Sequence, residues 1–280
     1  MNVPNRMGRG PFTVNQVEPG DRYELSEGHA IYCAPAGGDH AKASSIGALV
    51  IDSDPAVEST GIDAGYAFAT DTMRAPDISV GVPDKPGWVE GVPPLAIEYA
   101  AKGQDDDQLK AKIREFLAAG TKWIWIVRLT VPRHVEVHEK GRRMKRKHPG
   151  DYLEAPGVLK NSVPVEALFD RRVAQEVTLD NLLERKGYSS LEEVISKAKE
   201  AGQLEGKLEG KLEGALDGLR TAIIAVLESR GVAVSAKLRT RVLTEASSEQ
   251  LEAWVRRAAL VDRAEASRPV TALGALSHRT

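Results

Sequence analysis

Several features that identify whole classes of protein are missing from this 280-residue chain. Cys33 is the only cysteine, so no intrachain disulfide can form, and we interpret it as a small buried side chain. No stretch approaches the roughly 18 consecutive apolar residues of a membrane span, and the N-terminus has no apolar stretch of signal-peptide length. We therefore expect a cytoplasmic protein without membrane contact. No Ser-His-Asp or Cys-His arrangement stands out, which disfavours a metal-independent hydrolase.

The chain also lacks a strong net charge, which limits what its surface as a whole can attract. The formal net charge is −2, with 42% hydrophobic and 28% charged residues, as is ordinary for a soluble protein with a sizeable core. Any contact with nucleic-acid phosphates must therefore come from a local patch. The one basic cluster consists of Lys140, Arg142, Arg143, Lys145, Arg146 and Lys147. This cluster is either a DNA-binding patch or an exposed hairpin turn that charge keeps soluble.

Composition and periodicity divide the chain into four parts. Residues 1–18 are rich in Gly, Pro and Asn and are predicted to be a flexible lead-in. Residues 19–185 contain alternating strand and helix patterns and are predicted to form the folded domain. A helical tail is expected over 186–266, and residues 267–280 are predicted to be a disordered C-terminus.

Within residues 19–185, hydrophobic patterning predicts an alternation of strands and helices. Residues 22–34 read as two short strands, or as a helix end and a strand, broken at Glu27-Gly28. A helix is expected over 39–53, with Asp39 as its N-cap. A second helix is expected over 105–120, and strands are expected over 76–82, 93–100, 123–131 and 133–141. That order predicts an α/β fold whose core is a mixed β-sheet.

The tail contains a short repeat with a period of four residues. It reads LEGK, LEGK, LEG from Leu204 to Gly214, so a leucine stripe drifts only slowly around a helix. Each glycine costs about 1 kcal/mol of helix stability relative to alanine, so this stretch is either a flexible spacer or a packed, coiled-coil-like seam. The rest of the tail predicts amphipathic helices separated near Gly231 and Ser247.

Three residues in the predicted domain suggest chemistry. Asp77 begins a strand, and Glu98 ends a buried strand about twenty residues later, where an unpaired carboxylate would be costly. Magnesium prefers hard oxygen ligands and often binds one or two protein carboxylates, so these two residues are candidate ligands. Lys112, on the following helix, could point back to hold a water molecule and offset phosphate charge. Alternatively, the acids are surface or capping groups and Lys112 is solvated.

The order of these segments resembles the Uma2 family, also called DUF820, of restriction-endonuclease domains in the PD-(D/E)XK superfamily. The resemblance covers residues 22–170, over half of the chain. The matching segments are RYELSEG, RAPDISV, PPLAIEYA, KIREFLAAGTKWIWIV, VEVHEKG and SVPVEALF. The resemblance implies a PD-(D/E)XK core, with helices flanking a mixed β-sheet, followed by the helical tail. It also implies an endonuclease that hydrolyses DNA with Mg²⁺ or Mn²⁺, and a homodimer through the tail is one possible assembly.

The resemblance assigns roles to individual positions. It implies that Asp77 and Glu98 are the metal ligands and that Lys112 is the catalytic lysine, carried on a helix. Glu24 and His40 match positions that could add an acid and a phosphate-contacting histidine, with a structural hydrogen bond as the alternative for each.

The chain departs from the family pattern around this site. Position 100 is alanine, so the usual Glu-X-Lys lysine is absent and Lys112 must replace it, with Lys102 and Lys110 as further candidates. Ala101 stands where the family generally has serine. Gln108 and Arg128 stand where acidic residues are usual. Altered surroundings weaken metal sites in other proteins by 10- to 100-fold. The alternative reading is therefore a weakened or inactive nuclease fold that serves as a nucleic-acid-binding or oligomeric interaction protein through its tail.

Overall fold

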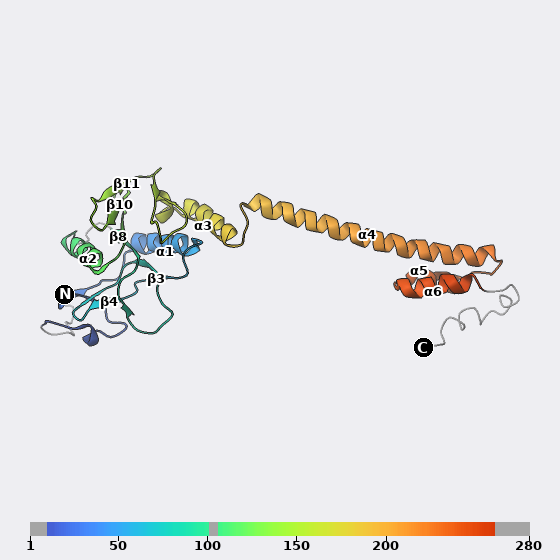
Figure 1. Cartoon of the computed structure of the whole chain (residues 1–280), viewed down its shortest axis with the longest axis horizontal. Helices are drawn as coiled ribbons and strands as arrows, with labels where there is room; N and C mark the ends of the chain where they lie inside the picture. Colours follow the sequence, from blue (N-terminus) through green and yellow to red (C-terminus); the bar gives the residue numbers. More distant parts are fainter. Residues whose placement is uncertain (1–9, 101–105, 261–280) are drawn as a thin grey trace. The chain divides into compact units, whose positions relative to one another are not determined.

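The computed structural model describes residues 10–100 and 106–260. The chain divides into two compact units, Met1–Glu193 and Val194–Thr280, and each is described by itself. The first unit contains all the strands and helices α1 to α3, and the second is helical (Figure 1).

A six-stranded mixed sheet forms the centre of the first unit, in the order β11-β10-β9-β8-β6-β3. Strand β8 pairs antiparallel with β6 but parallel with β9, as the sequence predicted for a mixed sheet. The strands are β3 (Thr60–Ile62), β6 (Ile78–Val80), β8 (Leu95–Ala100), β9 (Trp123–Arg128), β10 (His134–Glu139) and β11 (Lys145–Lys147).

Helices cover both faces of this sheet (Figure 1). On one face, α1 (Gly38–Ser53) and the 3₁₀ helix η2 (Val165–Leu168) pack on alternate strand residues, and α3 (Arg171–Arg185) packs on both helices. On the other face, α2 (Asp106–Ala119) packs through its apolar side. That side consists of Leu109, Ile113 and Phe116, spaced at i, i+4 and i+7 as an amphipathic helix requires. Burial of this side fixes the direction in which α2 presents Lys112, which is itself buried.

A five-stranded sheet in the order β2-β1-β5-β4-β7 lies beside this core. Its strands are β1 (Tyr23–Ser26), β2 (His29–Tyr32), β4 (Tyr66–Ala69), β5 (Thr72–Arg74) and β7 (Val89–Glu90). Of the two readings of residues 22–34, the pair of strands is therefore confirmed. The turn between β1 and β2 has positive φ angles at Glu27 (48°) and Gly28 (76°), which a tight hairpin requires. A short pair, β12 (Tyr152–Leu153) and β13 (Val163–Pro164), completes the strands.

The N-terminal segment differs from the sequence prediction. Part of the expected flexible lead-in is packed, because Phe12, Val14 and Val17 are buried against β1 and β5. The 3₁₀ helix η1 (Val14–Gln16) forms there, and the amide of Phe12 donates to the carbonyl of Gly28. These three apolar residues hold the segment on the sheet. The prediction of a flexible segment rested on its overall Gly and Pro content and did not consider them.

The expected helices form close to their predicted limits, with one error at a cap. Helix α1 begins after Gly37 as its N-cap, without any side-chain cap, so the assignment of that role to Asp39 was wrong. Asp39 instead lies in the first turn, where a carboxylate interacts favourably with the helix dipole.

In the described residues the tail forms three helices, and the first of them includes the LEGK repeat, so the repeat is helical and not a flexible spacer. They are α4 (Leu191–Ser229), α5 (Ala236–Thr244) and α6 (Ser248–Ala258). The breaks fall at the predicted positions, because Gly231 has a φ of 76° and the Ser247 hydroxyl caps α6. In the described part of the chain, no helix combines the length and apolar character that a membrane crossing requires. The predicted C-terminal stretch 267–280 lies outside the described residues.

Candidate active site

The register of the central sheet brings Asp77 next to Glu98. Ile78 of β6 pairs with Ile97 of β8 in an antiparallel ladder. The next two residues in this direction, Asp77 and Glu98, therefore lie opposite each other. Asp77 precedes the first residue of β6, and its Oδ2 accepts the amide of Tyr99 at 2.6 Å. Asp77 is therefore fixed by the backbone of the strand that carries Glu98.

Glu98 is a charged residue in an apolar row. It lies on β8 between Ala96 and Ala100, which pack under α2, and it is 4% exposed. Burial raises the pKa of Glu98 to about 8; Lys112 opposes this rise, while the negative charges of Asp77 and Glu24 add to it. A carboxyl group with a raised pKa loses its proton when a stronger positive charge, such as a metal ion, binds beside it.

Lys112 is the cation closest to this carboxyl. Its Nζ lies 2.6 Å from Glu98 Oε1 and 2.9 Å from Glu24 Oε1, and it donates to the carbonyl of Ala75 at 2.7 Å. Burial opposes its charged form, but the carboxylates of Glu24, Glu98 and Asp77 outweigh burial and raise the pKa of Lys112. The ammonium therefore stays charged and is held by three oxygen atoms from three different segments.

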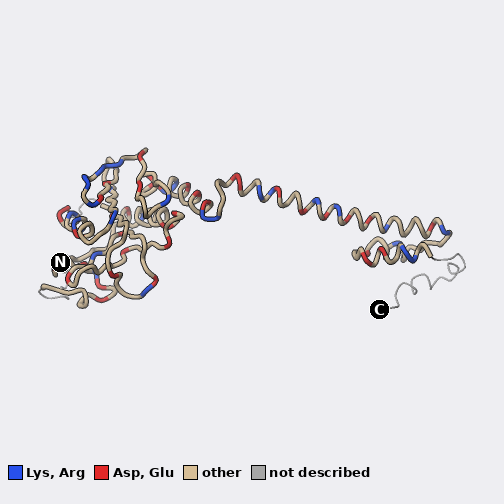
Figure 2. The backbone as a smooth tube through the Cα atoms, in the orientation of Figure 1, with Lys and Arg blue, Asp and Glu red and all other residues tan. Residues whose placement is uncertain are grey.

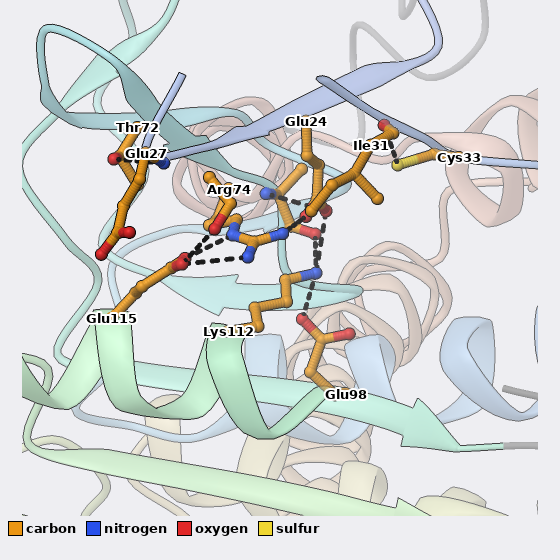
Figure 3. A network of polar contacts seen from close by, with 11 residues as sticks. Glu24, Glu27, Ile31, Cys33, Thr72, Arg74, Glu98, Lys112 and Glu115 are labelled. Carbon is orange, nitrogen blue, oxygen red and sulfur yellow. Dashed lines mark hydrogen bonds and ion pairs between the residues drawn. The ribbon is translucent and has the colours of Figure 1, made fainter. Parts of the chain in front are cut away.

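A second buried cation, Arg74 of β5, extends the cluster (Figure 3). Arg74 is 1% exposed; its Nη1 lies 3.0 Å from Glu24 Oε2, and its Nε lies 2.5 Å from Glu115 Oε2. Ser26 of β1 donates to the other oxygen of Glu115, also at 2.5 Å. Glu24 is therefore shared between Arg74 and Lys112, and Glu115, one helical turn after Lys112, ties α2 to the smaller sheet.

His40, in the first turn of α1, contacts the same oxygen of Asp77 that accepts the Tyr99 amide. Its Nε2 lies 3.0 Å from Asp77 Oδ2, and its ring meets the ring of Tyr99 edge-on at 6.0 Å. The hydrogen bond that the His40 ring donates to Asp77 is the largest cause that raises the pKa of His40, against partial burial that lowers it. Its Nδ1 is buried without a hydrogen-bond partner in the described residues.

The charges in this cluster do not balance. Four acids, Glu24, Asp77, Glu98 and Glu115, face two permanent cations, Arg74 and Lys112, with His40 as a third when it is protonated, so negative charge is in excess once Glu98 has released its proton. In the described ranges, no group of three or more His, Cys, Asp or Glu side chains is arranged to hold a metal ion. Magnesium commonly takes only one or two protein carboxylates, and the rest of its shell is water and phosphate. Asp77 and Glu98, with the excess of negative charge around them, fit a divalent cation of that kind.

Asp63 is a further acid at the rim of the cluster. It follows β3, where Ile62 pairs with Ile78, so the same row runs from Asp63 through Asp77 to Glu98. Its φ angle is 52°, a left-handed conformation that non-glycine residues seldom adopt. Loss of hydration and then the charge of Asp77 raise the pKa of Asp63. Sequence reasoning missed this residue, although a single acid in the short GIDAG segment was a visible signal.

The structure brings Asp77, Glu98, Lys112, Glu24 and His40 together in one cluster. Sequence reasoning missed Arg74 and Glu115, whose partners lie far away in the chain. The alternative lysine Lys110 pairs with Asp107 on the exposed side of α2, which removes it as a candidate, and Lys102 and Ala101 lie outside the described residues.

Arg128, at the end of β9, occupies a different environment from the cluster. It pairs with Glu136 at 3.2 Å and Asp106 at 3.0 Å, and its register partner on β8 is Ala100. The predicted basic cluster lies on the turn after β10 and on β11, with five of its six members exposed; Arg142 pairs with Glu139 at 3.0 Å.

Comparisons with known proteins identify the family and the fold. A profile of the Uma2 family, described as "Putative restriction endonuclease", matches residues 12–166, more than half of the chain. A solved structure from Anabaena variabilis ATCC 29413, described as "a putative nuclease belonging to DUF820", is similar with a TM-score of 0.51 and 21% identity. The alignment covers 57% of this chain and 99% of that one, which confirms the predicted fold class. No curated protein matches the chain.

Proposed function

This chain belongs to the Uma2 family of putative restriction endonucleases, and on that premise we propose that it is a metal-dependent endonuclease that hydrolyses DNA. The observation that carries the proposal is the juxtaposition of Asp77 and Glu98 on neighbouring strands with Lys112 against Glu98. Two carboxylates and one cation on a rigid sheet and helix are the minimum set for metal-assisted attack on a phosphodiester.

Asp77 and Glu98 would hold Mg²⁺ or Mn²⁺. When bound, such an ion neutralises charge on the phosphate and makes a nearby water molecule more acidic. Lys112 would offset negative charge at the phosphate. Its three N–H groups are directed at Glu98, Glu24 and the Ala75 carbonyl, so it would hold the attacking water only after the metal ion takes over Glu98. Arg74 contacts the second oxygen of Glu24 and so helps to hold Glu24 in position against Lys112.

DNA is the proposed substrate, and the basic cluster on the β10–β11 turn is the proposed contact for its backbone. The exposed members of this cluster can reach phosphates, and such contacts would make binding weaker as salt concentration rises. Because the whole chain has a net charge of −2, this local patch would supply the attraction.

Calorimetric titration with Mn²⁺ or Mg²⁺, paired with a plasmid-nicking assay, tests the proposal. The wild type is compared with Glu98→Ala and Asp77→Asn, and with Glu154→Gln as an exposed carboxylate outside both the acidic cluster and the basic cluster. We expect metal binding and nicking to vanish in the first two variants and to survive in the third. Nicking that persists in Glu98→Ala would remove this residue from the reaction.

A second candidate function is favoured by the environment of Arg128. Arg128 stands where the family usually has an acid, and it forms ion pairs with Glu136 and Asp106. Its register partner on β8 is Ala100, where the superfamily usually has a lysine. A nuclease fold retained for DNA binding or for oligomerisation through the tail would show DNA binding or self-association without metal binding in the same titration.

A further inference from the structure

Helix α4 carries an apolar stripe that is exposed over part of its length. Leu204, Leu208 and Leu212 are 61%, 59% and 59% exposed. The next leucine at the same spacing, Leu216, is 5% exposed and belongs to the core that α4 forms with α5 and α6. The stripe therefore leaves the core of the second unit and continues toward the start of α4 as an open apolar surface.

The four-residue repeat gives this part of α4 four chemically different sides. Successive helical residues are about 100° apart, so the leucines lie on one side and the glycines on the opposite side. Glutamates occupy one flank of the leucine side, and lysines occupy the other. Figure 2 shows both signs of charge recurring along this helix. The acidic flank consists of Glu205, Glu209 and Glu213, and the basic flank consists of Lys207 and Lys211.

We propose that the leucine side of α4 binds the same side of α4 in a second copy of this chain, with the two helices parallel and in register. In a parallel pair related by a two-fold axis, opposite flanks of the two helices meet along each edge of the contact. The acidic flank of each copy would then face the basic flank of the other. In an antiparallel pair each flank would face its own kind, with glutamate against glutamate and lysine against lysine.

The glycine side of the helix does not offer a comparable contact. A Cβ atom added at Gly206 or Gly210 would have no atom within 4 Å, so these positions face open space in the described residues. Glycine weakens an isolated helix, and a partner helix on the leucine side would compensate by burying apolar surface. The dimer does not depend on nuclease activity, so self-association can be measured separately from cleavage.

Sedimentation of the full-length chain over a range of concentrations tests the contact. We expect the wild type to dimerise and the triple variant Leu204→Ala, Leu208→Ala, Leu212→Ala to weaken association by at least ~100-fold, because six leucine side chains leave the contact. Leu243→Ala, which truncates a leucine that is 51% exposed on α5, is the matched control and should dimerise like the wild type. Gly206→Ala with Gly210→Ala should dimerise at least as well as the wild type.

Disulfide formation between introduced cysteines tests the orientation, in a Cys33→Ser background treated with a mild oxidant. In a parallel pair, Leu204→Cys and Leu212→Cys should each form cross-linked dimers alone. In an antiparallel pair centred on Leu208, cross-links would form only when the two variants are mixed. Rising salt should weaken a parallel dimer, since it screens attraction between opposite charges.

Three results would overturn the proposal. They are a wild type that stays monomeric at high concentration, a dimer that survives the triple leucine substitution, and cross-links that require the mixture of the two cysteine variants. Circular dichroism of the triple variant guards against misfolding, and alanine favours helix at least as well as leucine, so its helix content should be unchanged.

Discussion

The ionisation of Glu98 should make the first unit less stable as pH rises. Burial raises its pKa from 4.5 to about 8, against the opposing effect of Lys112. Between these two values the folded chain retains a proton that the unfolded chain has released, so the free energy of unfolding falls with rising pH and levels off above about pH 8. At about 1.4 kcal/mol per pH unit, this window sets an upper limit of about 5 kcal/mol. Water entry and side-chain movement reduce the loss below that limit.

Glu98→Gln is the variant that isolates this effect, because glutamine keeps the shape of the side chain but cannot ionise. The free energy of unfolding is measured from pH 5 to pH 9 with a chelator present, using denaturant and tryptophan fluorescence. A Trp254→Phe background restricts the signal to the first unit, which contains the other three tryptophans, Trp88, Trp123 and Trp125. The wild type should lose up to several kcal/mol relative to Glu98→Gln across this range.

The same experiment with Mg²⁺ present connects the stability of the fold to the proposed site. A cation that binds only the folded state stabilises it, and it should do so most at high pH, where Glu98 has lost its proton. Glu98→Gln should show little stabilisation. Wild-type and variant curves that stay parallel from pH 5 to pH 9 would refute the claim that a buried carboxyl ionises in this range.

Three other variants test the charge at the site, the packing under α1 and the basic cluster. Arg74→Met should destabilise the first unit by about 3–5 kcal/mol in chemical denaturation, because it removes the buried arginine that is shared by the buried Glu24 and the half-buried Glu115. Gly47→Ala should destabilise by at least about 1–3 kcal/mol, because the new Cβ would collide with the Tyr99 hydroxyl under α1; an unchanged melting temperature would contradict this. Arg142→Ser with Arg143→Ser should lower the slope of log DNA affinity against log salt by about 0.9 for each lost phosphate contact, and an unchanged slope would exclude these two residues from DNA binding.

The parts of the fold with strong local signals could be predicted from the sequence. The apolar run that became β8 and the i, i+4, i+7 pattern of α2 carry their own periodicity, so strand and helix form where that periodicity indicates. Asp77 and Glu98 stood out because each is an acid at the edge of an apolar strand. Lys112 was a candidate only because its helix follows Glu98, and its assignment as the catalytic lysine came from the family resemblance.

The unpredicted parts depend on contacts between distant segments. Arg74 meets Glu24 and Glu115, which lie 50 and 41 residues away, so no local pattern could show that it would be buried. The N-terminal segment was misread for the same reason, because Phe12 finds its partners on strands that come later in the chain. The Asp39 cap failed because a helix end has no fixed sequence, and glycine also serves at an N-cap.

The position of the site lysine follows from how this chain packs α2 on the sheet. Position 100, where the superfamily usually has its lysine, is an alanine that is 2% exposed beneath α2, in the same cluster as Leu109 and Ile113. A lysine there would have to displace that packing. Lys112 of α2 instead contacts Glu98 from the face of the sheet that α2 covers. The apolar side of α2 packs on the sheet and so fixes the position of Lys112. Alanine in place of lysine at position 100 is therefore compatible with the proposed site. Helix α2 supplies both the apolar packing on Ala100 and the positive charge of Lys112.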